Sequence, residues 1–329
     1  NNRYELVKLD RDDFSEDYKT LNQLFGLLVM AHYRTTPGDL RILMDSPGLH
    51  IWMALVDGQV AGALLVTEEG PLEDELAEAV WSGVRRPKGD LLPQTLIAQE
   101  GCKLAAPLKC GRIMRIAVHP ALQKKGLGAA LLDRLQAEAK SLAWDYIGTS
   151  FAANPELLSF WKKCGYSTVR FGSQRDAVSG CHAALMLSPL SEAGRAMSQH
   201  MRARFIEQLS YRLSDDLREL EGELVCELLH NTLSPPVLSD HDYSDLQAFA
   251  RHNRSYESCS LAIHKLLQAF LQTSDAAQVA EMLNEPEFLL LIRRNLQNIS
   301  WAGLEAEGQG RKSLMRQLKS VVGRLLDKY

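Results

Sequence analysis

Residues 112–132 read Arg-Ile-Met-Arg-Ile-Ala-Val-His-Pro-Ala-Leu-Gln-Lys-Lys-Gly-Leu-Gly-Ala-Ala-Leu-Leu and predict a strand, a turn, a glycine loop and a helix start. The first part is rich in β-branched residues and ends at a His-Pro turn, as a buried strand does. From Leu127 the apolar residues recur at helical spacing, which predicts an amphipathic helix. Gly126 and Gly128 stand where this helix begins.

The loop Gln123-Lys-Lys-Gly-Leu-Gly has the composition of an anion site. The first N–H groups of a helix have no intrahelical partners, and the helix dipole adds partial positive charge there. Glycines permit positive φ and a close approach, so that consecutive N–H groups can converge on a diphosphate. The charges of Lys124 and Lys125 favour the same ligand. The alternative is a strand-to-helix connection in which the glycines only allow tight packing.

Two sequence signatures, taken together, favour the anion site. No Walker loop and no Gly-x-Gly-x-x-Gly dinucleotide fingerprint occurs in the chain. Gln-x-x-Gly-x-Gly after Arg-Ile-Ala-Val-His-Pro instead resembles the acetyl-CoA pyrophosphate loop of the GNAT N-acetyltransferase superfamily. Asn154-x-x-Leu-x-x-Phe-Trp-x-x-x-Gly165-Tyr166 resembles the second signature of that superfamily, Asn-x-x-Ala-x-x-Leu-Tyr-x-x-x-Gly-Phe.

The resemblance implies that acetyl-CoA is the donor substrate. In that superfamily the strand that corresponds to Ile116–Val118 splays from the next strand, and the pantetheine amides pair with its exposed backbone. Carried onto matching positions, the acetyl-CoA contacts are Ile116, Ala117, Val118, Gln123, Lys124, Lys125, Gly126, Leu127, Gly128, Ala129, Glu156 and Lys163. Trp161 stands where many relatives have a tyrosine that can protonate the departing thiolate. Because an indole N–H is not a usable acid, we expect Trp161 to be a core residue.

Two further segments indicate which family of the superfamily the chain resembles. Arg85-Arg-Pro-Lys-Gly-Asp-Leu-Leu-Pro-Gln94 and Gly172-x-x-Arg175-x-x-x-Ser179-Gly-Cys are similar to segments of the bacterial tRNA(Met) cytidine acetyltransferase family. This resemblance implies N4-acetylation of the wobble cytidine of elongator tRNA(Met), with the helical tail as a tRNA-binding region. The alternatives are a GNAT enzyme acting on a protein or small-molecule amine, and a non-catalytic module that binds acetyl-CoA and RNA.

Members of that family also carry an upstream ATP-driven helicase module. Since the chain has no Walker loop and begins Asn-Asn-Arg without methionine, we expect a piece of a longer protein that lacks this module. ATP is expected only through the missing module. Whether the piece is active without it is left open.

Two surface segments are candidates for RNA contact. Arg85, Arg86 and Lys88 lie in a loop with rigid prolines, where the charges can be held in place against phosphates. Arg175 and Ser179 lie in a loop where the acceptor would enter. The alternative for both segments is ordinary solvated charge.

No catalytic general base is predicted. The exocyclic amine of cytosine is essentially uncharged at neutral pH, so it needs no deprotonation before attack. Positioning and backbone N–H donation to the oxyanion would then supply most of the rate. His119 and His182 are the imidazoles nearest the predicted site, and His119 is expected to be a turn residue.

Composition sets the broad class. The 329 residues are 46% apolar and 24% charged, as in ordinary globular proteins, and the net charge of −4 leaves an RNA partner open. The six cysteines are scattered without metal-ligand spacing, which favours reduced thiols in a cytoplasm and no metal. No apolar run is long enough to span a bilayer, so no membrane partner is expected. The oligomeric state is not predicted.

The order of elements gives the fold class. A strand at 4–9, helices at 16–32 and 36–44, a hairpin at 51–67 and the strand and helix of 112–142 follow the GNAT order. We expect an α/β (α+β) GNAT fold, with a mixed, mostly antiparallel sheet flanked by helices, in residues 1–190, with an insertion at about 68–111. Residues 191–329 are expected to form an all-α tail, with helices at 195–230, 243–253, 257–272, 275–283, 286–298 and 311–328.

Overall fold

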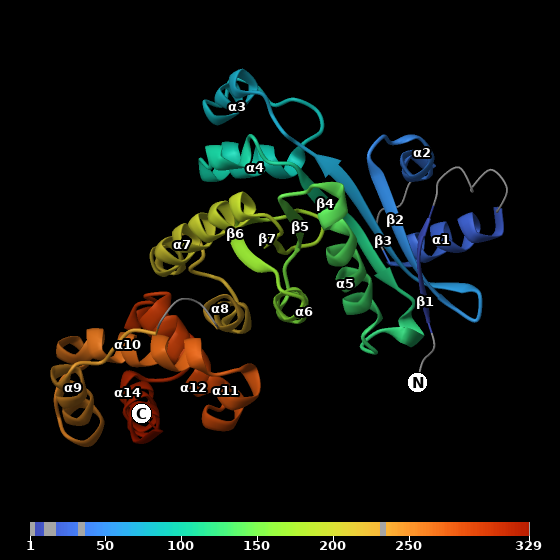
Figure 1. The fold of residues 1–329 in the computed structure, drawn as a ribbon. Coiled ribbons are helices and arrows are strands. Elements are labelled where there is room, and N and C mark those ends of the chain that lie inside the picture. Colours follow the sequence, from blue (N-terminus) through green and yellow to red (C-terminus); the bar gives the residue numbers. More distant parts are fainter. Residues whose placement is uncertain (1–3, 10–17, 32–36, 231–234, 329) are drawn as a thin grey trace. The chain divides into compact units, whose positions relative to one another are not determined.

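The computed structural model describes residues 4–9, 18–31, 37–230 and 235–328, which group into two compact units (Figure 1). The first unit contains the described residues of Asn1–Ala152, Phe160–Gly172 and Ala183–Arg202. The second contains Ala153–Ser159, Ser173–His182 and the described residues of Ala203–Tyr329. The boundary predicted at residue 190 stays a prediction. In the structure, Met197 and Met201 are still buried in the core of the first unit.

A seven-stranded sheet in the order β1-β2-β3-β4-β5-β7-β6 organises the first unit. Its strands are β1 (Glu5–Leu9), β2 (Leu49–Val56), β3 (Gln59–Glu69), β4 (Cys110–Val118), β5 (Tyr146–Ala152), β6 (Ser167–Arg175) and β7 (His182–Pro189). Strands β4 and β5 are parallel, whereas the pairs β1–β2, β2–β3, β3–β4 and β5–β7 are antiparallel. The predicted mixed, mostly antiparallel sheet is confirmed.

The hairpin between β2 and β3 turns at Asp57-Gly58, as predicted. Both residues have positive φ, 49° and 71°, which a two-residue type I′ turn requires. Asparagine, aspartate and glycine adopt this conformation most readily, so the dipeptide specifies the turn locally.

Helices cover both faces of the sheet. Leu24 and Leu28 of α1 (Tyr18–Ala31) share a buried cluster with Ile51 and Met53 of β2, and Leu43 of α2 (Pro37–Asp45) joins it. Trp52, between those two β2 residues, points to the other face, where its Nε1 donates to Glu138 of α5 (Leu127–Ala139) at 3.0 Å. The predicted helices are present, while residues 16, 17 and 32–36 lie outside the described chain.

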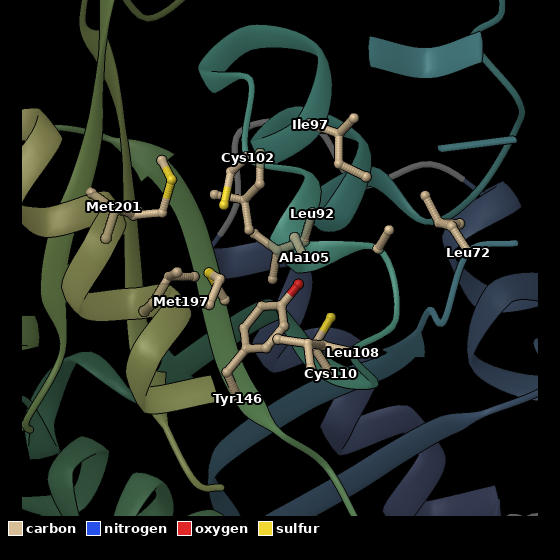
Figure 2. Close-up of a cluster of buried hydrophobic side chains, with 14 of the residues drawn as sticks. Leu72, Leu92, Ile97, Cys102, Ala105, Leu108, Cys110, Tyr146, Met197 and Met201 are labelled. Carbon is tan, nitrogen blue, oxygen red and sulfur yellow. The ribbon is translucent and has the colours of Figure 1, made fainter. Parts of the chain in front are cut away.

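The insertion adds two helices and a second core. α3 (Asp74–Trp81) and α4 (Leu91–Glu100) pack with Cys110, Tyr146 and the start of α7 (Glu192–Ser214) (Figure 2). Gly148 of β5 makes room for this packing, because a Cβ there would clash with Leu92 and Leu187. The insertion is therefore part of the folded core of the first unit.

The second unit is helical throughout its C-terminal part. Its remaining helices are α8 (Gly222–Leu229), α9 (Asp240–Arg251), α10 (Tyr256–Thr273), α11 (Ala276–Met282), α12 (Glu285–Leu291), α13 (Trp301–Glu305) and α14 (Arg311–Lys328), with a π-helical turn at Ile292–Leu296. No described helix is both long and apolar enough to cross a membrane. The six cysteines are free thiols.

The single helix predicted for residues 195–230 is wrong, because the chain leaves helical geometry between Ser214 and Gly222. Leu217 and Leu220 remain buried in the intervening turns, so the apolar spacing marked burial correctly. The Gln297 side chain donates to the Leu220 carbonyl at 2.6 Å, and Arg218 Nε donates to the Gln297 carbonyl at 3.1 Å. These distant partners satisfy polar groups at the break, and no local pattern reveals them.

Candidate functional site

Strands β4 and β5 lie side by side only at their beginnings. Their parallel pairing joins Cys110–Ile113 to Tyr146–Thr149 and, in the described chain, goes no further. β4 continues to Val118 along β3. Beyond Ile113 the edge of β4 that faces away from β3 is therefore not used for pairing with β5. An extended ligand that carries amide groups can add to such an edge as another strand would.

A bulge marks the place where the two strands part. Ile113 lies opposite Val66 and Arg115 opposite Leu65, so Met114 is the extra residue. A bulge bends the strand that carries it. The splay expected for the strand of Ile116, Ala117 and Val118 is thus present in the structure.

The glycine loop follows β4 directly and leads into α5. Lys124 and Gly126 both have positive φ, 60° and 85°. Left-handed residues beside a helix start turn N–H groups toward a common point, which makes a concavity for an anion. A Cβ on Gly126 would meet nothing within 4 Å, so this glycine serves the backbone conformation and not close packing.

Gly128, the second residue of α5, is a glycine for a different reason than Gly126. A Cβ there would lie 3.4 Å from the Phe160 ring and 3.8 Å from Val118, both ordinary contact distances. The packing of the protein therefore does not require a glycine at this position. Close approach of a ligand to the backbone gives a reason for it, which favours the anion site over a simple connection.

The loop is held in shape from both sides. Leu127 is buried, and Gln123 Nε2 donates to the Val118 carbonyl at 3.2 Å. Lys125 Nζ donates to the Ala121 carbonyl at 2.9 Å. The Ala121 N–H donates to His119 Nδ1 at 3.3 Å, so His119 is a turn residue, as expected. The predicted loop residues Gln123–Ala129 and the β4 residues Ile116–Val118 are brought together within the first unit.

Helix α6 (Pro155–Lys163) carries the second signature. Asn154 caps it, since the Leu157 N–H donates to Asn154 Oδ1 at 2.8 Å. Glu156 in its first turn and Lys163 at its end are both exposed. Glu156 groups with the second unit and Lys163 with the first, and their contacts with acetyl-CoA stay predictions.

Trp161 is a core residue, as predicted. It is 3% exposed, and its ring centroid lies 4.9 Å from Tyr166, 5.3 Å from Phe160 and 5.9 Å from Phe151. Burial raises the pKa of the neighbouring Tyr166 hydroxyl, which makes it a weaker acid, and its oxygen is enclosed by the protein. This aromatic cluster therefore offers no acid for the departing thiolate.

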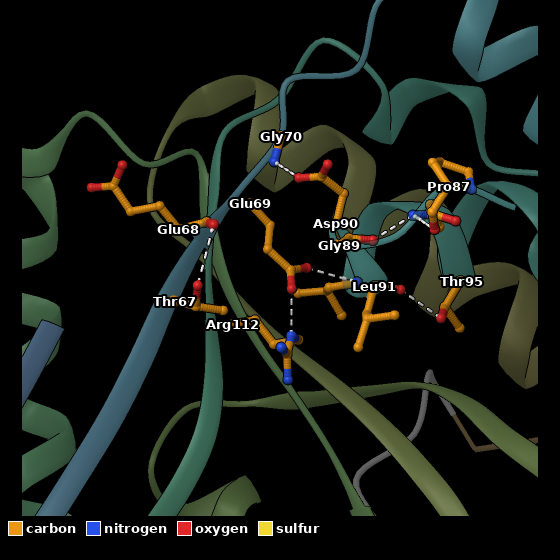
Figure 3. A network of polar contacts seen from close by, with 12 residues as sticks. Thr67, Glu68, Glu69, Gly70, Pro87, Gly89, Asp90, Leu91, Thr95 and Arg112 are labelled. Carbon is orange, nitrogen blue, oxygen red and sulfur yellow. Dashed lines mark hydrogen bonds and ion pairs between the residues drawn. The ribbon is translucent and has the colours of Figure 1, made fainter. Parts of the chain in front are cut away.

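The basic loop of the insertion is tied down by a polar network that the sequence reading missed (Figure 3). Buried Glu69 accepts from Arg112 Nε at 2.5 Å and from the Leu92 N–H at 2.8 Å. Asp90 accepts from the Gly70 N–H at 2.7 Å. The partners are 20 to 43 residues apart in the chain, so only the fold reveals them.

The same loop is also held from inside. The Gln94 side chain donates to the carbonyls of Pro87, at 3.1 Å, and of Gly89. Arg85, Arg86 and Lys88 are exposed on this fixed backbone. Within the described chain, none of these three side chains has a hydrogen-bond or ion-pair partner.

The second candidate segment for RNA contact, with Arg175 and Ser179, forms hydrogen bonds within the second unit. Arg175 donates to the Gly180 carbonyl at 3.0 Å and to Glu221 at 2.7 Å. Ser179 donates to Asp176 Oδ1 through its N–H at 2.8 Å and its hydroxyl at 3.1 Å. Arg175 and Ser179 therefore stabilise their loop, and their contact with RNA stays a prediction.

The remaining histidine, cysteine and tyrosine side chains named here do not form a catalytic or metal-binding group among the described residues. His182 is buried, and the described residues contain no group of histidine, cysteine, aspartate or glutamate side chains that could hold a metal ion. Burial raises the pKa of the Cys110 and Tyr146 side chains deep in the core. These groups are inert at neutral pH.

One family of known proteins matches the part of the chain that contains these elements. The family model "GNAT acetyltransferase 2" matches residues 23–141 and 131–191, which together make up just over half of the chain. Among solved structures, the ribosomal-protein-S18-alanine N-acetyltransferase of Escherichia coli covers 57% of this chain and 95% of its own, with 15% identity and a TM-score of 0.39.

Curated relatives match almost the whole chain. The tRNA(Met) cytidine acetyltransferase TmcA of Nitrosococcus halophilus is 42% identical over 325 residues, which are 96% of this chain and 43% of that protein. The protein of the same name from Methanopyrus kandleri is 33% identical over 99% of this chain and 39% of its own. The chain thus spans less than half the length of these relatives.

Proposed function

Because the chain belongs to the GNAT acetyltransferase 2 family, we propose that it transfers the acetyl group of acetyl-CoA to the N4 amine of a tRNA cytidine. The observation that supports the proposal is that the part of β4 beyond its pairing with β5 leads directly into the glycine loop. One binds a chain of amides and the other an anion, and the two follow each other as pantetheine and diphosphate do in acetyl-CoA. The amine acceptors of other acetyltransferases are the second candidate.

The donor contacts follow from the two subsites. Ile116–Val118 pair with the pantetheine amides, and the N–H groups of residues 124–129 surround the diphosphate. Lys124 and Lys125 add positive charge at the loop. Glu156 and Lys163 are proposed as further contacts, from their places in the second signature.

The reaction needs few protein groups. The cytidine N4 attacks the thioester carbon, the N–C bond forms, and the C–S bond breaks to release the CoA thiolate. The proton lost from N4 passes to the sulfur directly or through water, because Trp161 and Tyr166 are buried and cannot serve as the acid. Positioning and N–H donation to the oxyanion supply the catalysis.

The acceptor is proposed from the relatives. Their names specify tRNA(Met) cytidine, so we propose the wobble cytidine of elongator tRNA(Met) as the target. The proposed RNA contacts are Arg85, Arg86 and Lys88 of the insertion, Arg175 at the end of β6 and Ser179 of the β6–β7 loop. Residues 191–329 are proposed as a tRNA-binding region. Any ATP dependence would reside outside these 329 residues, which contain no Walker loop.

The proposal is tested with the 329-residue chain, acetyl-labelled acetyl-CoA and unmodified tRNA(Met), followed by nucleoside mass spectrometry. The expected product is N4-acetylcytidine at a single position. A polyamine and a lysine-containing peptide serve as competing acceptors. Label on those acceptors alone would favour the second candidate. Binding of acetyl-CoA without transfer to any acceptor would contradict catalysis by this chain alone.

A further inference from the structure

The insertion exposes an aromatic ring next to the three cations of the basic loop. Trp81, the last residue of α3, is 47% exposed, and Val84 is 77% exposed. Arg85, Arg86 and Lys88 follow directly and are exposed as well. We call Trp81, Val84, Arg85, Arg86 and Lys88 the insertion surface.

The backbone of the insertion surface is fixed at the end of α3. Gly83 has a φ of 76°, and the N–H groups of Val84 and Arg85 both donate to the Ala79 carbonyl, at 2.9 and 3.0 Å. A left-handed glycine with such bonds caps a helix end tightly. The other end of the loop is held by Gln94 and Asp90, as described above. A partner therefore meets a loop that needs little ordering, which favours binding.

The charges of the insertion surface are available to a ligand. Elsewhere in the described chain, arginines such as Arg112, Arg175 and Arg324 are paired with carboxylates. Arg85 and Arg86 have no such partner, and a guanidinium is a good donor fork for phosphate oxygens. The acidic residues of α3 in its first turn, Asp74 and Glu75, lie at the opposite end of the helix.

The Trp81 ring is held in place and still accessible. Lys103 Nζ lies 3.9 Å from the centroid of the ring and is itself bonded to Glu78 at 2.5 Å. Gly101 lies beside the indole nitrogen, where a Cβ would come within 3.7 Å. These contacts orient the indole and leave nearly half of the residue exposed.

We propose that the insertion surface binds an unpaired stretch of the RNA acceptor, with a base stacked on Trp81 and phosphates paired with Arg85 and Arg86. The inference rests on the proposed function. An unpaired base offers its face to an aromatic side chain, whereas a base inside a duplex does not. An acidic peptide would satisfy the cations but would leave the ring without a planar partner.

The test measures binding of a fluorescent ten-nucleotide single-stranded RNA and the matching duplex to the full chain over a range of salt concentrations. Trp81→Leu is expected to weaken single-strand binding about tenfold, because stacking is lost, while Trp81→Phe stays close to wild type. Neither variant should change the salt dependence. Arg85→Ala/Arg86→Ala should lower the slope of log K against log salt by about 0.7 for each lost phosphate contact.

Lys19→Ala/Lys140→Ala removes two other exposed cations of the first unit and should leave the slope unchanged. Wild-type RNA affinity of Trp81→Leu, or equal loss for the duplex, would overturn the inference. So would displacement of the RNA by a polyglutamate peptide as effectively as by unlabelled RNA. If the wild-type chain acetylates tRNA, and Trp81→Leu and Arg85→Ala/Arg86→Ala bind RNA as the wild type does, only this inference fails. If the wild-type chain transfers no acetyl group, that result counts against the proposed function.

Discussion

At position 161 the indole is enclosed by three aromatic rings and is 3% exposed. Trp161→Phe is therefore expected to cost about 1–2 kcal/mol of unfolding free energy through lost packing. Urea denaturation measures this cost. The pH profile of acetyl transfer should not change, since the indole supplies no proton. A loss of transfer with unchanged stability would instead assign Trp161 a role in the reaction.

A substitution of Gly128 is expected to change ligand affinity without lowering the stability of the protein. Gly128→Ala places a Cβ at ordinary contact distance from Phe160, and alanine is the better helix former by about 0.5–1 kcal/mol. The variant should be as stable as wild type or slightly more so in thermal unfolding. Its affinity for acetyl-CoA should fall severalfold, because the methyl group would stand where the proposed site receives the diphosphate. Calorimetric titration would contradict the account if the affinity were unchanged.

The loop of Gly126 and Gly128 between a strand and a helix could be predicted from the sequence, because it depends on neighbours within a few residues, and its role as an anion site stays a prediction. The strand before them and the helix after them have strong local patterns. Glu69, Asp90 and Gln94 were missed for the opposite reason. Each fixes the basic loop or its surroundings through a partner that the fold brings near, so no local pattern marks them.

At the scale of elements, Glu69 joins β3, β4 and the start of α4. Glu69→Gln leaves the Arg112 guanidinium without its carboxylate, and the Arg112 side chain is only 21% exposed. We expect a loss of about 2 kcal/mol in unfolding free energy. RNA affinity should fall with it, because the basic loop loses its anchor, while acetyl-CoA affinity should not.

The matched control for this change is Glu257→Gln. Its partner Arg311 lies at 3.3 Å, and both side chains are more than half exposed, so the pair should contribute less than about 1 kcal/mol. Equal losses of stability in the two variants would show that the buried position of Glu69 does not matter.

Helices α9 and α10 are linked by Asp242, which bonds Lys265 and caps α9 together with Ser239. Lys265 and Ser239 hold the pKa of Asp242 at about 2, whereas an unfolded aspartate has a pKa of about 3.9. The ionised carboxylate therefore adds stability that is fully present above about pH 4 and is lost as the pH falls toward 2.

Asp242→Asn should lower the unfolding free energy by on the order of 1–2 kcal/mol at pH 7 and by less at pH 3. Urea titrations at the two pH values measure the difference. Asp240→Asn, at an exposed position of the same helix, should show little effect at either pH. A deficit of Asp242→Asn that is equal at both pH values would contradict the assigned pKa.

The elements themselves were largely predictable. Strands, hairpin and amphipathic helices follow from alternation, turn residues and caps, all of which act over short distances. The break at 215–221 could not be predicted, since Leu217 and Leu220 keep the helical spacing while Gln297, far along the chain, satisfies the Leu220 carbonyl. The helix α13 is too short to show a period.

At the scale of the molecule, the proposed acetyl-CoA site depends on a fold that two short signatures specify. The splay of β4 from β5 was expected from resemblance and is present in the strand pairing. The insertion surface is different, because its cations become a candidate RNA contact only together with the anchoring network and the exposed ring of Trp81. The sequence alone shows that the loop is positively charged, and the structure shows that hydrogen bonds fix its backbone.

The most direct test of the donor site is hydrogen exchange across the whole chain, with and without acetyl-CoA. Exchange should slow at the amides of residues 115–118 and 124–129, where the ligand covers the β4 edge and the glycine loop. Helices α9 to α14 of the second unit should exchange at unchanged rates. Unchanged exchange in those two segments, with slowing confined to other parts of the chain, would contradict the account.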